Sequence, residues 1–85
     1  MKSHTNNTMA KLGITGLKII TLLDKERMHV NELRAALDDF GAISKYLGRL
    51  EDLGLIKREK IGIRIVNTIT PKGKRVLKTL QSLEL

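Results

Sequence analysis

The chain has 85 residues, of which 41% are hydrophobic and 29% charged, and its formal net charge is +7. This length predicts a single domain with a modest core, and the hydrophobic fraction is too high for general disorder. Because cysteine is absent, disulfides, thiolate chemistry and cysteine-ligated zinc are excluded. No apolar run approaches the roughly 18 residues of a membrane span, and the N-terminus lacks the apolar segment of a signal peptide. The sequence therefore predicts a cytoplasmic protein with no membrane partner.

Positive charge is concentrated in the last third of the chain. Residues 56–85 carry eight cations and two acids, whereas residues 31–55 carry three cations and five acids. This asymmetry favours a polyanionic partner, with nucleic acid ahead of a membrane surface; the alternative is a solvated basic surface. Phe40 and Tyr46 are the only aromatic residues. Single strands and RNA loops usually stack on several aromatic side chains, so the composition favours duplex DNA.

The N-terminal part of the chain divides into a tail and a helix. Residues 1–12 are polar and unpatterned, which predicts a flexible tail before a single domain over 13–85. A helix is expected over 15–25, with Thr15 as its N-cap. Its buried stripe consists of Ile14, Leu17, Ile20 and Leu23.

A short strand and a second helix are expected next. Residues 28–30 are extended, and Asn31 is a suitable N-cap for a helix over 32–38. His29 is expected at the surface, where contact with a phosphate is the alternative. In the turn that follows, the predicted roles are a cap for Asp39, a core contact for Phe40 and unusual backbone angles for Gly41.

The third helix is expected over "AISKYLGRLEDLG", ending at Gly54. Its apolar face contains Ile43 and Leu47, and at about 100° per residue the polar residues point the opposite way. Gly48 costs about 1 kcal/mol against alanine in a helix, so either DNA or another helix approaches closely there, or the defect is tolerated. The outward residues are Ser44, Lys45, Gly48, Arg49 and Asp52.

A hairpin and a last helix complete the chain. Two β-branched runs, 56–60 and 63–69, are joined at Ile61 and Gly62, which predicts strands whose isoleucines pack on the core and whose cations face phosphates. The last helix is expected over 71–84, capped by Thr70 with Pro71 at its first position. A leucine-rich stripe on this helix is wider than a small core needs, which predicts a dimer interface formed by Val76, Leu77, Leu80 and Leu83.

This order predicts an α+β fold that is mainly helical. We expect a winged helix-turn-helix with a short two- to three-stranded wing sheet and a C-terminal helix. The major groove of B-DNA admits one α-helix, and the second helix of such a pair can enter it. The hairpin beside that helix can reach the flanking backbone or the minor groove.

Two segments, "ISKYLGRLEDLGLIKRE" and "ITPKGKRVLKTL", are similar to the winged-helix transcriptional regulators of the MarR-like and ArsR-like kind. The resemblance spans roughly residues 30–80. It implies that the third helix is the recognition helix and that residues 58–64 form the wing. Arg34 stands where many relatives carry a small residue, and the long helices that build an effector pocket in the MarR-type group are missing. The candidate DNA-binding residues are Ala42, Ser44, Lys45, Gly48, Arg49, Arg58, Lys60, Gly62 and Arg64.

The sequence thus predicts a transcriptional regulator that binds double-stranded DNA sequence-specifically as a homodimer. The alternatives are an architectural protein that binds DNA without sequence preference, and a protein-interaction module that uses the isoleucines around Ile61. No enzyme activity, cofactor, metal or small-molecule ligand is expected. The acidic residues at helix ends are interpreted as caps rather than as catalytic groups or metal ligands, namely Asp38, Asp39, Glu51 and Asp52.

Overall fold

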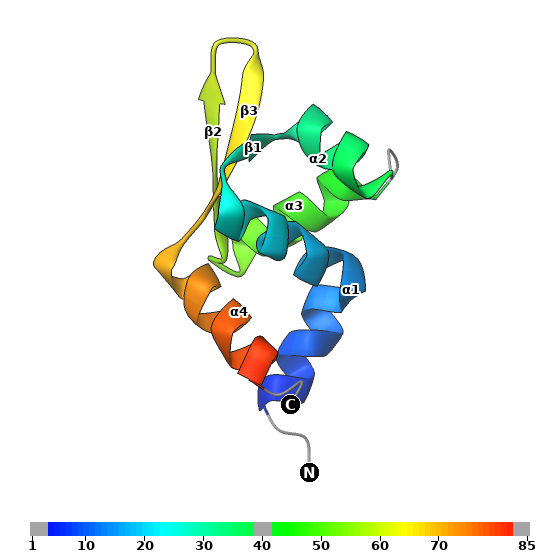
Figure 1. Cartoon of the computed structure of the whole chain (residues 1–85), viewed down its shortest axis with the longest axis vertical. Coiled ribbons are helices and arrows are strands. Elements are labelled where there is room, and N and C mark those ends of the chain that lie inside the picture. Colours follow the sequence, from blue (N-terminus) through cyan, green and yellow to red (C-terminus); the bar gives the residue numbers. More distant parts are fainter. Residues whose placement is uncertain (1–3, 39–41, 83–85) are drawn as a thin grey trace.

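A computed structural model describes residues 4–38 and 42–82, with side chains from residue 13 onward within these ranges. The described chain forms helices and one antiparallel sheet in the order α1 (His4–Lys25), β1 (Met28–His29), α2 (Val30–Leu37), α3 (Ile43–Asp52), β2 (Ile56–Ile61), β3 (Arg64–Ile69) and α4 (Pro71–Ser82) (Figure 1). The β2–β3 hairpin projects from one end of the molecule, and α4 lies toward the other end. No helix in the described ranges is long and apolar enough to cross a membrane.

Helix α1 is longer than predicted and is kinked. Gly13 has φ 68° and ψ 172°, so α1 consists of two helical segments that meet at this residue. Residues 4–12, predicted to be a flexible tail, are helical, and only the second segment corresponds to the prediction for 15–25. Figure 1 shows the first segment beside the C-terminal end of α4, and the two helices are in contact. A helix that depends on such a contact is not readable from a polar sequence without periodicity.

Helix α2 begins two residues earlier than predicted, because His29 rather than Asn31 is its N-cap. The backbone N–H of Glu32 donates to Nδ1 of His29 at 3.3 Å, and the backbone N–H of His29 donates to Oε1 of Glu32 at 3.0 Å. These two reciprocal bonds form a capping box, which satisfies two free donors at the helix start. Val30 is therefore helical rather than extended. Histidine is an uncommon capping residue, which is why sequence preference pointed to Asn31.

The end of α2 is closed by a left-handed residue. Asp38 has φ 52° and ψ 43°, and its backbone N–H donates to the carbonyl of Arg34. Asp38 was predicted to be the last helical residue and is instead the C-cap, through its backbone N–H rather than its carboxylate. The roles predicted for Asp39, Phe40 and Gly41 fall outside the described residues.

Helix α3 follows the prediction closely. Ile43, Leu47 and Leu50 are buried, and the outward polar residues lie on the opposite side. Leu53 is the C-cap, and Gly54 has φ 75°, which ends the helix as expected for glycine at this position. The helix therefore presents one apolar face to the core and one polar face to solvent.

The sheet has the order β1-β3-β2, with β3 in the centre. The hairpin turn lies at Gly62 and Ile63, one residue later than predicted, because Ile61 pairs with Arg64 across the strands. Gly62 has φ 64°, as required at the first loop position of a type II′ turn. This single shift puts Ile63, rather than Ile61, at the tip of the wing.

The core is formed where the four helices of the described chain and the base of the sheet meet. Thr70 caps α4 as predicted, since the backbone N–H of Gly73 donates to its Oγ1 at 3.0 Å. The Thr70 hydroxyl in turn donates to the carbonyl of Gly54 at 2.7 Å, which ties α4 to the end of α3. The most deeply buried core side chains are Ile19, Ile20, Leu33, Ile43, Leu47 and Leu50.

The prediction that the leucines of α4 form a dimer interface is wrong for Leu77 and Leu80. Leu77 and Leu80 are 3% and 4% exposed and belong to the core of their own chain. Val76 is partly buried against the same core, and Leu83 lies outside the described residues. The stripe looked too wide for a small core because the sequence does not show that α4 packs against α1. These leucines therefore stabilise the single chain rather than forming a free apolar face.

Candidate nucleic-acid interface

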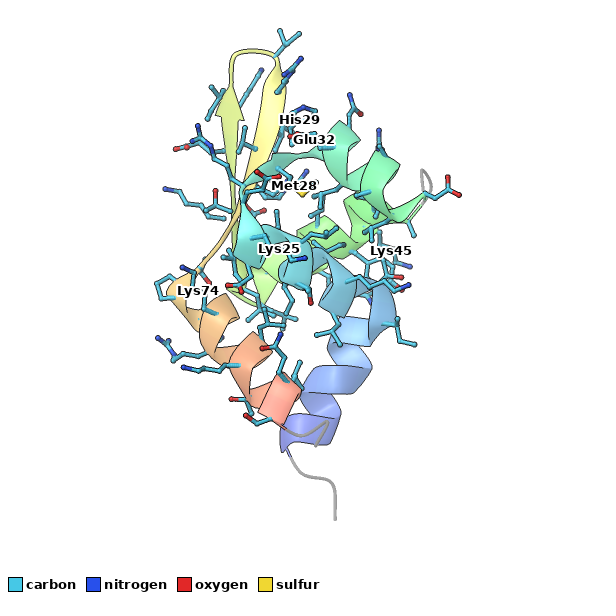
Figure 2. All side chains as sticks on the ribbon, viewed as in Figure 1. Lys25, Met28, His29, Glu32, Lys45 and Lys74 are labelled. Atoms are coloured by element: carbon cyan, nitrogen blue, oxygen red, sulfur yellow. The ribbon has the colours of Figure 1, made fainter. Side chains whose placement is uncertain are left out.

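The outward face of α3 carries the cations predicted to read DNA. Ser44, Lys45 and Arg49 are exposed. At about 100° per residue, Ser44 and Arg49 lie about 140° apart around the helix axis, with Lys45 between them. Figure 2 shows Lys45 and Lys74 on opposite sides of the molecule, so the cations of α3 and α4 do not form one patch.

Gly48 lies in the middle of this outward face. A Cβ added to Gly48 would meet no heavy atom within 4 Å in the described chain. Packing against another helix of the described chain therefore does not require glycine at position 48. Of the explanations raised from the sequence, close approach of DNA and a tolerated defect both remain.

Arg49 is held over an aromatic ring. Its Cζ atom lies 5.6 Å from the centroid of the Tyr46 ring, within the range of a cation–π contact. Tyr46 is half-buried, and its Cε1 atom is 3.7 Å from the position that a Cβ of residue 13 would occupy. The kink of α1 at Gly13 thus supports Tyr46, which supports the guanidinium of Arg49.

The strand register divides the wing into two faces. Residues directly opposite each other share a face, so Arg58 and Asn67 lie together, as do Lys60 and Ile65. Lys57, Glu59, Ile61 and Arg64 lie on the other face because side chains alternate along a strand.

The prediction that the hairpin isoleucines pack on the core is correct only at the base of the wing. Ile56 and Ile69 are buried there, whereas Ile63 at the tip is 96% exposed and Ile61 and Ile65 are also exposed. The wing extends beyond the core, so the apolar side chains of its outer half have no neighbours to cover them. An exposed apolar tip was expected only under the alternative of a protein-interaction module that uses the isoleucines around Ile61.

A groove of about 300 Å³ lies between the wing and the starts of α2 and α3. Inside it, Nη2 of Arg34 donates to Oγ of Ser44 at 3.0 Å. Nε of Arg58 donates to Oδ1 of Asn67 at 3.1 Å. Figure 2 shows His29 and Glu32 next to each other where the wing meets α2. The polar residues that line the groove are His29, Asn31, Arg34, Ser44, Arg58 and Arg64.

The sequence-based site thus missed Arg34 and Asn67, and gave His29 only as an alternative phosphate contact. Arg34 and His29 line the groove, and Asn67 accepts a hydrogen bond from Arg58, which also lines it. Asn67 carried the clearest signal, since it is a polar residue in a β-branched run at a position that alternates with buried Ile69. The contribution of Arg34 depends on the angle between α2 and the wing, which no local pattern specifies.

The cations around this surface are not neutralised. Among the side chains that the structure describes, no lysine or arginine makes an ion pair with a carboxylate. The one pair that the described side chains form joins Nε2 of His29 to Oε1 of Glu32 at 3.3 Å. Within the same residues, no group of three or more histidine or acidic side chains is placed to hold a metal ion. The surface is therefore suited to binding an anion.

Comparison with known proteins shows which solved structures share this fold. No protein-family model matches the sequence, and no curated protein matches it. The structure is similar to a protein described as a MarR-family transcriptional regulator of Enterococcus faecalis V583, at 25% identity and a TM-score of 0.79, over 98% of this chain and 84% of that one. It is also similar to the transcriptional regulator BldR of Sulfolobus solfataricus, at 26% identity and a TM-score of 0.77, over 93% of this chain and 65% of BldR.

A third solved structure shows the same architecture over almost the whole chain. It is described as a MarR-family transcriptional regulator of Porphyromonas gingivalis W83, with 22% identity and a TM-score of 0.81, over 99% of this chain and 91% of that one. The winged helix-turn-helix fold is therefore confirmed, as is the resemblance to MarR-like regulators. These similarities also support DNA-binding regulation as the kind of function.

Proposed function

We propose that this winged-helix protein is a transcriptional regulator that binds double-stranded DNA with α3 in the major groove. The observation that carries the proposal is the outward face of α3, where Lys45 and Arg49 are exposed and make no ion pair with any described carboxylate. The helix belongs to a fold that this chain shares with solved transcriptional regulators. The width of an α-helix suits the major groove. Arg49 would read a base edge, because arginine can donate two hydrogen bonds to guanine O6 and N7.

In this proposal the wing lies along the flanking backbone. Lys60 and Arg64 are exposed near its tip, where they can contact phosphates on the side of the groove that α3 does not reach. Gly62, at the turn, allows the tip to approach the backbone because no side chain projects from it. Ala42 and Ser44 would contact DNA at the start of α3, and Gly48 would allow α3 to lie deep in the groove.

We further propose that the protein acts as a homodimer, with two copies of α3 reading half-sites about 34 Å apart. Because the leucines of α4 are buried in their own chain, the contact between the two copies would use other surface residues. Ile14, just after the kink of α1, is 76% exposed and is the apolar residue best placed for it, together with partly buried Val76. Sedimentation should then give twice the 9.6 kDa mass of one chain. A single-chain mass at the concentration that saturates DNA would exclude the dimer.

The test of the function is selection of bound duplexes from a random pool, followed by titration of the enriched duplex and several unrelated ones. A regulator should prefer its site by at least about 10³-fold. Equal affinity for all duplexes would instead indicate an architectural protein. Binding should also weaken steeply with salt, since each phosphate contact contributes a slope of about −0.9 in log affinity against log salt.

The exposed apolar tip favours a second candidate function, a protein-interaction module. Ile63 is 96% exposed and is flanked by the exposed side chains of Ile61 and Ile65, which a partner protein could cover. Absence of any duplex shift at low salt would favour this function over DNA binding. Under the regulator proposal, Ile63→Ser should leave the preference for the selected duplex intact, because α3 supplies the base contacts.

A further inference from the structure

We propose that the groove between the wing, α2 and α3 seats one phosphodiester of the DNA backbone, bound by the guanidinium groups of Arg34 and Arg58. The inference rests on the proposed DNA binding and adds to it a contact from α2 and a positioning role for Asn67. Neither Arg34 nor Asn67 belongs to the recognition helix or to the exposed part of the wing.

Arg58 is oriented by a residue that is completely buried. Asn67 is 0% exposed, and its Oδ1 accepts from Nε of Arg58 at 3.1 Å. Its Nδ2 donates to the backbone carbonyl of Met28 at 3.1 Å, which links β3 to β1 and fixes which way the amide points. Arginine has five N–H donors, so the bond to Asn67 leaves the outer nitrogens of Arg58 available. Asn67 is therefore a positioning residue for a half-buried cation at the base of the wing.

Arg34 is held from the other side of the groove and is incompletely paired. Its Nη2 donates to Oγ of Ser44 at 3.0 Å. Its Nε–H is buried and has no hydrogen-bond partner among the described residues. Buried polar groups are nearly always paired in folded proteins, so this unpaired donor requires a partner, which can be a water molecule or a bound ligand. A phosphate oxygen beside this guanidinium, with a small rotation of the side chain, would supply that partner.

The groove has the charge and size for one phosphate. Arg34, Arg58 and Arg64 line it, and no aspartate or glutamate among the described residues does. Glu32, on the same helix as Arg34, is engaged by the capping box with His29. A volume of about 300 Å³ is at the lower limit of ligand sites in proteins, and guanidinium groups match the geometry of phosphate oxygens.

The position of the groove identifies the phosphate as one of the DNA backbone. The groove is open, and its wall includes Ser44 at the start of α3 and Arg64 on the wing. Both residues belong to the surface that faces DNA in the proposed complex. A helix lodged in the major groove has a phosphate strand on each side, and this groove lies on the side of α3 toward the wing.

The first test compares Arg34→Gln with Arg75→Gln, a matched loss of one charge at an exposed position of α4 outside the site. Duplex affinity is titrated against potassium chloride. Arg34→Gln should weaken binding to all sequences alike and reduce the salt slope measurably, by up to about 0.9, the contribution of one phosphate. Arg75→Gln should leave both quantities close to those of the unaltered chain. If the two variants behave alike while the unaltered chain binds DNA, the groove proposal is overturned and the proposed function stands. If the unaltered chain binds no duplex, both are overturned.

The role of Asn67 is tested by a double-mutant cycle with Arg58. Asn67→Ala should weaken duplex binding in the unaltered chain but not in Arg58→Gln, because Asn67 acts through that arginine. A purely structural effect of Asn67 would persist in the Arg58→Gln background and would overturn its positioning role. If Asn67→Ala does not fold by circular dichroism, Arg58→Gln alone keeps the test decisive, since a binding curve unchanged from that of the unaltered chain would also overturn the proposal.

The source of the phosphate is distinguished by nitrogen-15 NMR of the arginine side chains. The Nε–H signal of Arg34 should shift on addition of the duplex, and less when one backbone phosphate is replaced by a neutral methylphosphonate at the contacted position. Inorganic phosphate is the comparison. A shift caused by inorganic phosphate but not by saturating duplex would overturn the assignment to DNA.

Discussion

Two glycines inside helices, Gly48 and Gly73, have opposite surroundings. A Cβ at Gly73 would overlap the carbonyl oxygen of Leu55 and lie 2.8 Å from Cγ1 of Ile69, whereas a Cβ at Gly48 would meet nothing within 4 Å. Gly73 therefore allows α4 to lie directly against the start of β2. Glycine is therefore required for close packing at position 73, whereas position 48 has room for a larger side chain.

This contrast gives a prediction on stability. Gly73→Ala should destabilise the fold by about 1–3 kcal/mol, as overpacking of a core does, although alanine is the better helix former. Gly48→Ala is the matched control and should stabilise the free protein by up to about 1 kcal/mol. Urea unfolding of the two variants measures both effects. Equal stabilisation by the two alanines would show that α4 is not packed as closely as described.

The capping and buried polar residues show where prediction from sequence stops at the residue scale. The cap at Thr70 follows from a local pattern and was predicted correctly. The capping by His29 and the burial of Asn67 were not predicted, because each depends on a partner, Glu32 in an unusual capping box and Arg58 across the hairpin. To predict that Arg34 lines the groove, one must know how α2 lies against the wing, and the sequence does not show this.

At the scale of elements, helix α1 contacts α3 beside Tyr46. Its kink at Gly13 lies against Tyr46, and Tyr46 carries the guanidinium of Arg49 on its ring. The sequence predicted the second segment of α1 from its apolar stripe, although Ile14 of that stripe is exposed, and α3 from its two faces. It misplaced the hairpin turn by one residue, since Ile61-Gly62 and Gly62-Ile63 both provide a glycine, and only the pairing of Ile61 with Arg64 distinguishes them.

The kink leads to a prediction on coupling between the two helices. Gly13→Ala should destabilise the fold by about 1–3 kcal/mol, because alanine is strained at a φ of 68°. The variant should also alter DNA affinity more than its loss of stability explains, because Tyr46 and Arg49 lose their support. Binding curves well below the unfolding temperature, set beside those of Arg49→Ala, provide the measurement. Unchanged affinity in Gly13→Ala would indicate that α1 does not position Arg49.

At the scale of the whole molecule, the cations of residues 31–82 fall into two regions. One comprises α3, the groove and the wing; the other is the outer side of α4 with Lys74, Arg75 and Lys78, which are all exposed. The sequence showed that cations are concentrated in the last third of the chain, but not that the fold separates them. Figure 1 shows the wing and α4 toward opposite ends. A specific interface therefore uses only part of the positive charge.

The most direct test of DNA binding through α3 compares two double variants with equal loss of charge. Lys45→Ala/Arg49→Ala removes two cations from α3, and Lys74→Ala/Lys78→Ala removes two from α4. Duplex titrations at one salt concentration should show that the α3 variant loses the preference for the selected duplex, while the α4 variant retains it with nearly unchanged affinity. Equal weakening by both variants would mean that affinity follows net charge alone, and would contradict a DNA-reading surface on α3.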